Sequence, residues 1–288
     1  MKVGIGLPNT TPGATGKLIA DWARRAEERG FSALATIDRV AYPSFDSLVT
    51  LSAAGAVTER IGLLTNILLG PTRSTALLAK EAASVDQISG GRLVLGLGAG
   101  AREDDFVVIG KGFHDRGKRF DQQVADLQDA FAGKPIEGSD KPVAPLPARE
   151  DGVPIVIGGH SDAAVRRAAR FGIGWTAGGA PPDQVVPIIA RVREAWGQAG
   201  REGRPYIYAL QYFSLGDEHI ETSKHSILDY YAYFGGTERG FAEYIPRSAE
   251  RLRETQQAFA DGGVDELLWD PTVPDLDQVD LLADAALS

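Results

Sequence analysis

The sequence of 288 residues contains no cysteine. Disulfide bonds, thiolate nucleophiles, cysteine-ligated zinc and iron–sulfur clusters are therefore excluded. Positive charge is also scarce, because 30 Lys and Arg residues stand against 39 Asp and Glu residues and the formal net charge is -9. Such a chain repels a phosphate backbone, so nucleic acid is not an expected partner.

Long apolar runs are missing as well. No stretch of about 18 apolar residues is present to span a bilayer. The N-terminal segment MKVGIGLPNTTPG lacks the apolar region of a secretory signal. We therefore expect a cytoplasmic protein with no membrane partner.

Histidine is rare, with four residues in the whole chain. His114 is placed in a loop, and His219 and His225 do not share a helical face. No H-E-x-x-H or comparable spacing is present, so a metal site is not expected.

Short apolar runs alternate with amphipathic helical segments along the whole chain. This rhythm predicts parallel strands joined by helical crossovers. The strands are expected at 3–7, 33–37, 61–66, 93–98, 155–158, 174–177, 207–214 and 266–269. Eight strand–helix units in a chain of this length predict an α/β fold, a (β/α)8 TIM barrel in which residues 1–288 form a single domain.

The helices between the strands have recognisable ends. Helical apolar patterns stop before Gly30 and before the pair Gly90-Gly91, and Ser161 can cap another helix. Further helices are expected over 182–198, 226–233, 237–261 and 275–286. Residues 133–152, after the fourth helix, contain four prolines and predict a short irregular insertion.

The run Gly96-Leu97-Gly98-Ala99-Gly100 is superficially like the dinucleotide fingerprint G-x-G-x-x-G. Its third glycine comes one residue early, and three carboxylates follow at 103–105, where a pyrophosphate requires bare helical amides. We therefore interpret these glycines as positions where a flat ligand approaches the backbone at the end of a barrel strand.

Three blocks of the sequence resemble the bacterial luciferase-like flavin-dependent oxidoreductases. Residues 56–100 contain the family's T-x-R-I, P-x-R, L-A-K and S-G-G-R-L-x-L-G-x-G-x-G patterns. The other blocks are VPIVIGGHSDAAVRRAARFGIGW (153–175) and GGVDELLWDP (262–271). The resemblance covers nearly the whole chain, and it implies a (β/α)8 barrel with a flavin or deazaflavin at the C-terminal ends of its strands.

By this resemblance, a strand-to-helix turn holds the cofactor phosphate, and the end of the next strand forms a neighbouring wall. The turn consists of Gly158, Gly159, His160 and Ser161, and the wall of Ala177, Gly178 and Gly179. Amides at a helix start carry partial positive charge and have no internal partner, which suits a phosphate. The alternative from the residues alone is an ordinary tight turn with a serine N-cap.

The resemblance also places the cofactor ring against Thr65 and Asn66, with a non-proline cis peptide at or next to Asn66–Ile67. Gly98 and Gly100 flank this position from the next strand. The alternative for this strand end is an ordinary one with a capping Asn. The residues that finish the first strand, expected to border the substrate side of the ring, are Leu7, Pro8 and Asn9.

Asp38 and Arg39 end the second strand, where many relatives have Asp-His and use the imidazole near the reactive ring position. A guanidinium cannot act as a base near neutral pH, but it can pair with an anionic substrate or a developing charge. We hypothesise that the two residues are catalytic, the alternative being an Asp–Arg surface pair. Aromatic residues are frequent in the C-terminal third, and some of them are candidates for the wall of an apolar substrate pocket, the alternative for most being core packing: Tyr206, Tyr208, Tyr212, Tyr230, Tyr231, Tyr233 and Phe234.

Together these features predict a luciferase-like monooxygenase that uses reduced FMN and O2 on a small organic substrate. The chain has no nicotinamide fingerprint, which favours reduced flavin supplied by a separate reductase. The alternative on the same fold is a hydride-transfer enzyme using 8-hydroxy-5-deazaflavin, coenzyme F-420. Its longer acidic tail would require basic residues at the mouth, for which the candidates are Arg73, Arg102, Arg116 and Lys118. An alternative of another class is a barrel that binds flavin without turnover. Members of this family often form homodimers.

Overall fold

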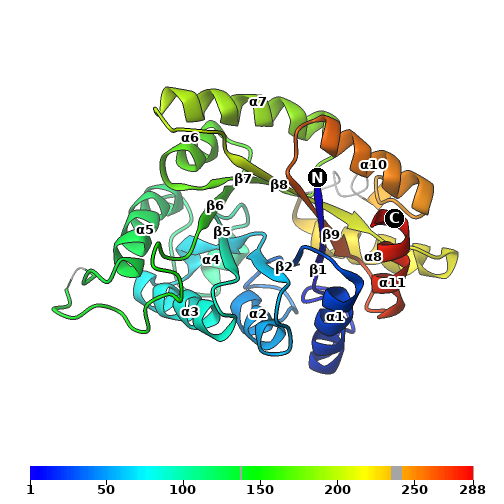
Figure 1. The fold of residues 1–288 in the computed structure, drawn as a ribbon, viewed down its shortest axis with the longest axis horizontal. Helices are drawn as coiled ribbons and strands as arrows, with labels where there is room; N and C mark the ends of the chain where they lie inside the picture. Colours follow the sequence, from blue (N-terminus) through cyan, green and yellow to red (C-terminus); the bar gives the residue numbers. More distant parts are fainter. Residues whose placement is uncertain (137, 235–241, 288) are drawn as a thin grey trace.

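The structure is a computed structural model of the chain, and it describes residues 1–136, 138–234 and 242–287. Within these residues, nine parallel strands form one sheet in the order β3-β2-β1-β9-β8-β7-β6-β5-β4, and a further pairing of β3 with β5 closes it (Figure 1). The strands are β1 (Lys2–Gly6), β2 (Ala33–Thr36), β3 (Gly62–Thr65), β4 (Leu68–Leu69), β5 (Leu93–Gly98), β6 (Ile155–Gly158), β7 (Gly174–Ala177), β8 (Tyr206–Phe213) and β9 (Glu266–Pro271).

The predicted TIM barrel is confirmed, and each of the eight predicted strands is present. The additional strand β4 has two residues and follows β3 directly. β3 pairs with the start of β5 through Leu63 and Leu93, whereas β4 pairs with its end through Leu68 and Leu97. β3 and β4 therefore share one position of an eight-position barrel.

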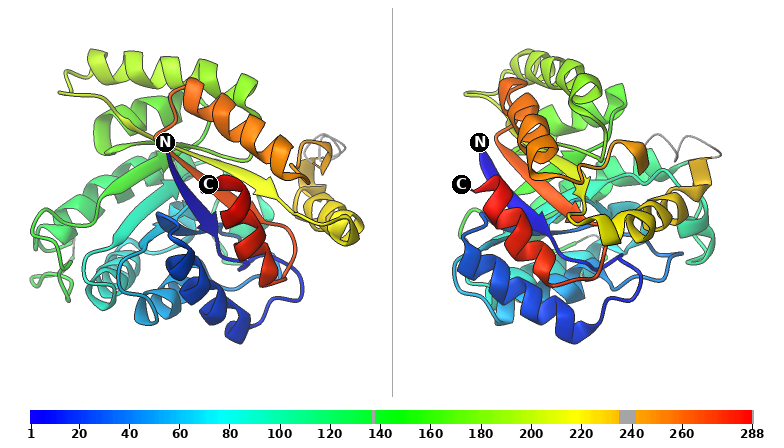
Figure 2. Two further views of the ribbon diagram at one scale, coloured as in Figure 1. Left: turned by 45° about the vertical axis from the view of Figure 1, so that its right-hand side comes forward. Right: turned by 90° about the vertical axis from the view of Figure 1, so that its right-hand side faces the viewer.

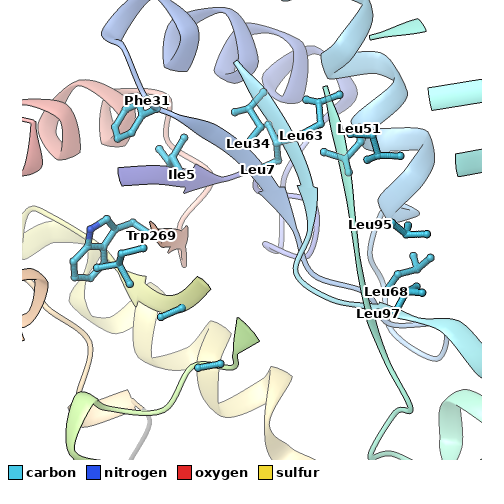
Figure 3. Packing of buried hydrophobic residues seen from close by; sticks show 14 of the residues in the cluster. Ile5, Leu7, Phe31, Leu34, Leu51, Leu63, Leu68, Leu95, Leu97 and Trp269 are labelled. Carbon is cyan, nitrogen blue, oxygen red and sulfur yellow. The ribbon is translucent and has the colours of Figure 1, made fainter. Parts of the chain in front are cut away.

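Residues along the strands alternate between two hydrophobic layers. Leu34 and Trp269 pack in the layer between the strands and the helices (Figure 3). Their chain neighbours Ala35 and Leu268 belong to a separate cluster inside the barrel. Parallel strands covered by helices are buried on both faces, which explains the nearly continuous apolar runs in the sequence. The result is a rigid frame beneath the strand ends.

The outer helices contact one another in the order α1, α2, α3, α5, α6, α7, α10, α11 and back to α1 (Figure 2). The helices are α1 (Gly16–Arg29), α2 (Ser47–Ala56), α3 (Thr75–Ile88), α4 (Asp104–Val107), α5 (Arg116–Phe131), α6 (Asp162–Phe171), α7 (Pro182–Gln198), α8 (Ile220–Tyr230), α10 (Ala249–Asp261) and α11 (Asp277–Ala286). Short 3-10 helices are η1 (Gly70–Thr72), η2 (Asp217–His219) and η3 (Ala232–Phe234). No helix among the described residues has the length and apolarity that crossing a membrane requires.

The helix predictions hold in part. Ser161 caps α6 as predicted, its hydroxyl accepting a hydrogen bond of 3.2 Å from the Ala164 amide. The prediction of a single helix over 237–261 is wrong for the residues that the structure describes, 242–261. The chain from 244 to 248 is not helical, and α10 begins only after Pro246, which has no N–H to donate. Residues 237–241 of that prediction lie outside the described residues, and α8 begins at Ile220, six residues before its predicted start.

Residues 133–136 and 138–152 form the described part of the predicted irregular insertion between α5 and β6, and hydrogen bonds hold it against α3. Gln87 Nε2 donates to the Leu146 carbonyl at 2.9 Å, and the Ala148 amide donates to Asp86 Oδ2 at 2.9 Å. The insertion is thus attached to the outer layer of helices.

Candidate functional site

A cavity of about 580 Å³ opens where the strands end, the face at which TIM barrels carry their sites. Most of the predicted site residues line it. They are Asp38, Arg39, Asn66, Gly98, Gly100, Gly158, Gly159, His160, Ser161, Gly178 and Gly179. The ends of β2, β3, β5, β6 and β7 therefore deliver residues that are far apart in the sequence to one place.

The turn between β3 and β4 forms one wall of the cavity. The Asn66–Ile67 peptide bond is cis, as the family resemblance implied for this position. Asn66 Oδ1 accepts a hydrogen bond of 2.6 Å from Thr176 Oγ1, whereas Asn66 Nδ2 is buried and no described residue accepts from it. A buried amide donor at a cavity wall is available to a ligand, because leaving it unsatisfied is costly.

The side chain of Ile67 explains two of the glycines. A Cβ at Gly158 would lie 2.8 Å from Ile67 Cγ2, and a Cβ at Gly98 would collide with Ile67 Cδ1. These glycines thus make room for Ile67, which itself lines the cavity. Gly178 differs, since no heavy atom lies within 4 Å of its Cβ position. A side chain at Gly178 would extend into open space of the cavity.

The start of α6 forms the polar end of the cavity. Ser161 is the N-cap, and the preceding Gly159 has a φ of 119°, a conformation that favours glycine. Trp175 Nε1 donates a hydrogen bond of 2.8 Å to the Gly159 carbonyl and so fixes the turn. The ring of His160 lies 6.2 Å from that of Trp175, and burial lowers the pKa of the imidazole. The free amides of the helix start suit a phosphate.

Two arginines lie near this end. Arg116 lines the cavity, and its Nε donates to the Gly100 carbonyl at 2.8 Å. No carboxylate among the described residues is within ion-pair distance of Arg116. Arg167 also lines the cavity, but its Nε donates to Asp121 Oδ1 at 2.6 Å. Arg116 therefore offers the less compensated charge.

Arg39 is buried, with 7% of its side chain exposed, and is not half of a surface pair with Asp38. Its Nε donates to Asp105 Oδ2 at 2.7 Å, and its Nη2 donates to Asp104 Oδ2 at 2.8 Å. Asp105 Oδ1 also accepts from the amide of Val40 at 2.8 Å. The guanidinium thus joins the end of β2 to α4 while it lines the cavity.

Asp38 has separate partners. Its Oδ2 accepts a hydrogen bond of 2.9 Å from the Leu69 amide, and Arg73 Nη2 lies 3.6 Å from its Oδ1. Burial raises the pKa of Asp38, and the charge of Arg73 opposes this change only in part. A buried carboxyl of this kind, at the edge of a cavity, is a candidate for proton transfer.

Three tyrosines close the cavity beside β8. The hydroxyl groups of Tyr212 and Tyr231 are 2.8 Å apart, and the guanidinium of Arg102 lies 4.4 Å from the ring centroid of Tyr230. Burial raises the pKa of each of these phenols, so they stay protonated at neutral pH. Tyr230 and Tyr231 thus contribute to the wall for which they were candidates.

A buried carboxyl that the sequence did not single out lies behind these tyrosines. Asp270, in β9, is 2% exposed, and no described residue donates to its Oδ1. Gly6 makes room for it, because a Cβ at Gly6 would collide with the carboxyl. Asp270 lines a small cavity of about 20 Å³ that shares Tyr212 and Tyr230 with the main one. Burial raises the pKa of Asp270 well above its usual range.

Some predicted residues do not line the cavity, namely Leu7, Pro8, Asn9, Thr65 and Ala177. Asn9 Nδ2 donates to the Ile37 carbonyl at 2.8 Å, and Thr65 Oγ1 donates to the Gly96 carbonyl at 2.7 Å. Both side chains tie neighbouring strand ends together. The substrate contacts expected for residues 7–9 stay a prediction.

Other lining residues were missed in the sequence: Ile67, Leu69, His114 and Arg167. His114 has no signal because a loop histidine follows no periodicity. Arg167 has a weak one, since it lies on the helix whose first turn is the predicted phosphate site. No group of three or more His, Cys, Asp or Glu residues that could hold a metal occurs in the described part of the chain.

A flat ligand that carries a phosphate fits this donor set. The start of α6 and Arg116 supply positive charge at one end, and the unsatisfied Asn66 Nδ2 supplies a donor on the wall. The open space beside Gly178 leaves room between them. The volume is within the range of about 300–1,000 Å³ that is usual for ligand pockets.

Comparison with known proteins identifies the family of the chain. An uncharacterised protein of Mycobacterium tuberculosis is 34% identical over 206 residues, which cover 62% of this chain and 71% of that protein. The F420-dependent glucose-6-phosphate dehydrogenase of Nakamurella multipartita is 31% identical over 202 residues, 64% of this chain and 59% of that enzyme. The crystal structure of monooxygenase RslO1 from Streptomyces bottropensis shares the fold, with a TM-score of 0.82 at 22% identity over 100% of this chain and 99% of that one. The family model for luciferase-like monooxygenases matches residues 1–277, and the chain therefore belongs to that family of oxidoreductases.

Proposed function

We propose that this chain is an oxidoreductase that binds FMN or an 8-hydroxy-5-deazaflavin in the cavity at the C-terminal ends of the strands. One observation carries the proposal: a single cavity joins a helix start suited to a phosphate with a wall that offers the buried amide of Asn66. Neither feature by itself selects a ring-bearing phosphate, but the two together do.

The protein's own residues bind, orient and shield the cofactor. The start of α6 and Arg116 hold the phosphate, Asn66 orients the ring, and Tyr230 and Tyr231 keep water from it. When bound, the cofactor supplies hydride or, as reduced FMN, reacts with O2. Arg39 is an electrostatic and positioning group, because a guanidinium stays protonated and cannot act as a base.

The first candidate reaction is oxygenation of a small organic substrate with reduced FMN. A separate reductase would supply the reduced flavin, since the sequence contains no nicotinamide fingerprint. The second candidate is hydride transfer with the deazaflavin, which is supported by the 31% identical relative whose name gives F420 as its cofactor. In both reactions the substrate lies against the tyrosine side of the cavity.

Cofactor binding tests the proposal directly. The purified chain is titrated with FMN and with the deazaflavin cofactor, followed by absorption and fluorescence, and at least one is expected to bind. Gly178→Leu fills open space of the cavity, so we expect binding to weaken at least about tenfold, which corresponds to about 1.4 kcal/mol. The control is Gly197→Leu, because Gly197 lies on α7, also has open space around its Cβ position and does not line the cavity.

Two results would count against the proposal. If neither cofactor binds the wild-type chain, the assigned function is wrong. If a cofactor binds but Gly178→Leu and Gly197→Leu both retain wild-type affinity, the cofactor lies elsewhere.

A further inference from the structure

The carboxyl of Asp270 lies behind the tyrosine end of the main cavity. It belongs to β9, which is placed between β1 and β8 in the sheet (Figure 1). The small cavity of about 20 Å³ that Asp270 lines shares three lining residues with the main cavity, namely Ile37, Tyr212 and Tyr230. These side chains therefore lie between Asp270 and the main cavity.

The surroundings of Asp270 suit a protonated carboxyl better than a carboxylate. No described residue donates a hydrogen bond to its Oδ1. Three hydroxyl groups that line the small cavity donate instead to backbone carbonyls at 3.0–3.1 Å: Thr11 to Pro271, Ser226 to Thr222, and Thr272 to Phe213. Each of these hydroxyls has one proton, so toward the cavity it offers an acceptor. A protonated carboxyl supplies the donor that such acceptors need, whereas a carboxylate requires donors.

The titratable groups that share the small cavity with Asp270 are phenols. Tyr212 comes from β8 and Tyr230 from α8. The end of β2 contributes an isoleucine, and the segment after β1 contributes two threonines, none of which ionises. Burial raises the pKa of Asp270, and no cation of the described chain offsets this rise. The carboxyl therefore faces hydroxyl groups and not charges.

Tyr212 connects Asp270 to the substrate end of the main cavity. Its hydroxyl oxygen lies 2.8 Å from that of Tyr231, which lines the main cavity. The small cavity between Asp270 and Tyr212 is large enough for one water molecule, and a water can bridge two such groups almost as well as a direct hydrogen bond. Asp270, this water, Tyr212 and Tyr231 thus form a chain that can carry a proton.

Both candidate reactions need a proton at this end of the cavity. Hydride transfer to a carbonyl carbon leaves a negative charge on the carbonyl oxygen, and the release of one atom of O2 as water also consumes protons. Arg39 does not supply the proton, because a guanidinium keeps its own near neutral pH. Tyr231 alone is a poor source, since a phenol is a weaker acid than a carboxyl by about six pKa units and would be left as a buried anion.

We propose that Asp270 supplies this proton and that Tyr231 delivers it to an oxygen atom at the substrate end. The inference rests on the proposed function, which places the substrate against the tyrosines. Asp270 gives its proton to the bridging water, the water gives one of its own to the Tyr212 oxygen, and the Tyr212 hydroxyl proton passes to Tyr231. Tyr231 then gives its own hydroxyl proton to the acceptor oxygen.

Each O–H bond that breaks along the chain is replaced by a new one. The net change is that Asp270 becomes a carboxylate and the acceptor oxygen gains a proton, and Asp270 takes up a proton from solvent by the same path after the product leaves. Tyr231 is therefore the group that touches the substrate, and Asp270 acts through it.

Infrared spectroscopy of the purified chain at neutral pH tests whether Asp270 holds a proton. The difference spectrum between the wild type and Asp270→Asn is expected to contain the C=O band of a protonated carboxylic acid. Asp270→Ser provides a second assignment of that band. The control is Asp265→Asn, because hydrogen bonds lower the pKa of Asp265 and its removal should leave this band unchanged.

The path is tested by exchange in D2O, because the band shifts when a deuteron replaces the carboxyl proton. Tyr212→Phe and Tyr231→Phe each remove one hydroxyl from the chain. We expect each to slow the exchange by at least about tenfold, because the proton must then wait for a local opening of the fold. The control is Tyr208→Phe, which removes a buried phenol of β8 that lines neither cavity and should exchange like the wild type.

Three results would overturn the proposal. If the wild type has no carboxylic acid band from Asp270, this residue holds no proton to give. If either Tyr212→Phe or Tyr231→Phe exchanges as fast as the wild type, or if Tyr208→Phe slows exchange equally, the proton does not leave by this chain. The spectra need neither cofactor nor substrate, so these failures leave the proposed function standing, whereas the proposed function fails on the cofactor titration.

Discussion

Asp270 gives the clearest test of the electrostatics beneath the site. Its carboxyl is 2% exposed, no described residue donates to its Oδ1, and burial raises its pKa well above the usual range. A carboxyl with a raised folded-state pKa favours the folded chain in its protonated form. The stability this contributes is fully present below the unfolded pKa of about 3.9, and it is lost as the pH rises through the folded pKa.

Asp270→Asn removes the ionisation with almost no change of shape. Between the unfolded and the folded pKa of Asp270, the unfolding free energy of the wild type falls by up to about 1.4 kcal/mol per pH unit because of this residue. The variant has no such decrease, because its amide does not ionise. We expect the variant to match the wild type near pH 4 and to exceed its stability at pH 7 by at least about 1.4 kcal/mol. Urea-induced unfolding at a series of pH values measures both curves.

Asp265, directly before β9, provides a control because its pKa is shifted in the opposite direction from that of Asp270. Burial acts to raise the pKa of Asp265, but hydrogen bonds from Arg204 and from the Ile207 amide outweigh it, so the pKa is lowered. Its contribution to stability is present above the unfolded pKa and is lost as the pH falls through the folded pKa. Asp265→Asn should therefore lose stability at neutral pH. If Asp270→Asn follows the wild-type pH curve in parallel, the argument that burial raises the pKa of Asp270 is refuted.

Two further predictions concern the frame and the assembly. Arg92 donates hydrogen bonds of 2.6–2.9 Å to the carbonyls of Gly55, Ile61 and Ser89. Because a lysine cannot make these bonds together, Arg92→Lys should lower the unfolding free energy, measured by urea titration, by about 3 kcal/mol or more. A loss below about 1 kcal/mol would contradict this role. The homodimer expected from the family resemblance stays a prediction, and the apolar side chain of Val49, 69% exposed on α2, is a position at which to test it. Val49→Lys should then shift the mass in light scattering from dimer to monomer, whereas a wild type that is already monomeric refutes the pairing.

The barrel could be predicted from the sequence because its signals are local. Alternating layers demand an apolar residue at nearly every strand position, and the N-cap of α6 depends only on Ser161 and the following turn. The break before α10 is local too, but Pro246 falls within an otherwise helical pattern, which by itself predicts an uninterrupted helix.

The site residues could be predicted from the sequence only where a short local segment, such as the turn before α6, determines their positions. The partners of Arg39 come from α4, 65 and 66 residues further along the chain, and no periodicity connects the two segments. Likewise, Gly98 and Gly158 look like places for a ligand in the sequence, but Ile67 fills the space that their missing side chains leave. Packing between distant segments therefore decides which group occupies the space that a glycine leaves open.

The distribution of charge around the cavity separates what binds the cofactor from what binds the substrate. Arg39 is compensated by Asp104 and Asp105, whereas Arg116 beside the start of α6 has no carboxylate partner among the described residues. The charge of Arg116 thus lies at the phosphate end, while the guanidinium of Arg102 lies 4.4 Å from the ring centroid of Tyr230 at the other end. At that end, burial raises the pKa values of Tyr230 and Tyr231 and so keeps these phenols protonated, and burial also raises the pKa of the nearby Asp270. A cavity built in this way attracts an anionic cofactor at one end. At the other end it offers protonated phenols to an apolar part of the substrate and the guanidinium of Arg102 to a polar or anionic part, because an anion enters a buried site only where a charge or a hydrogen bond replaces its lost hydration.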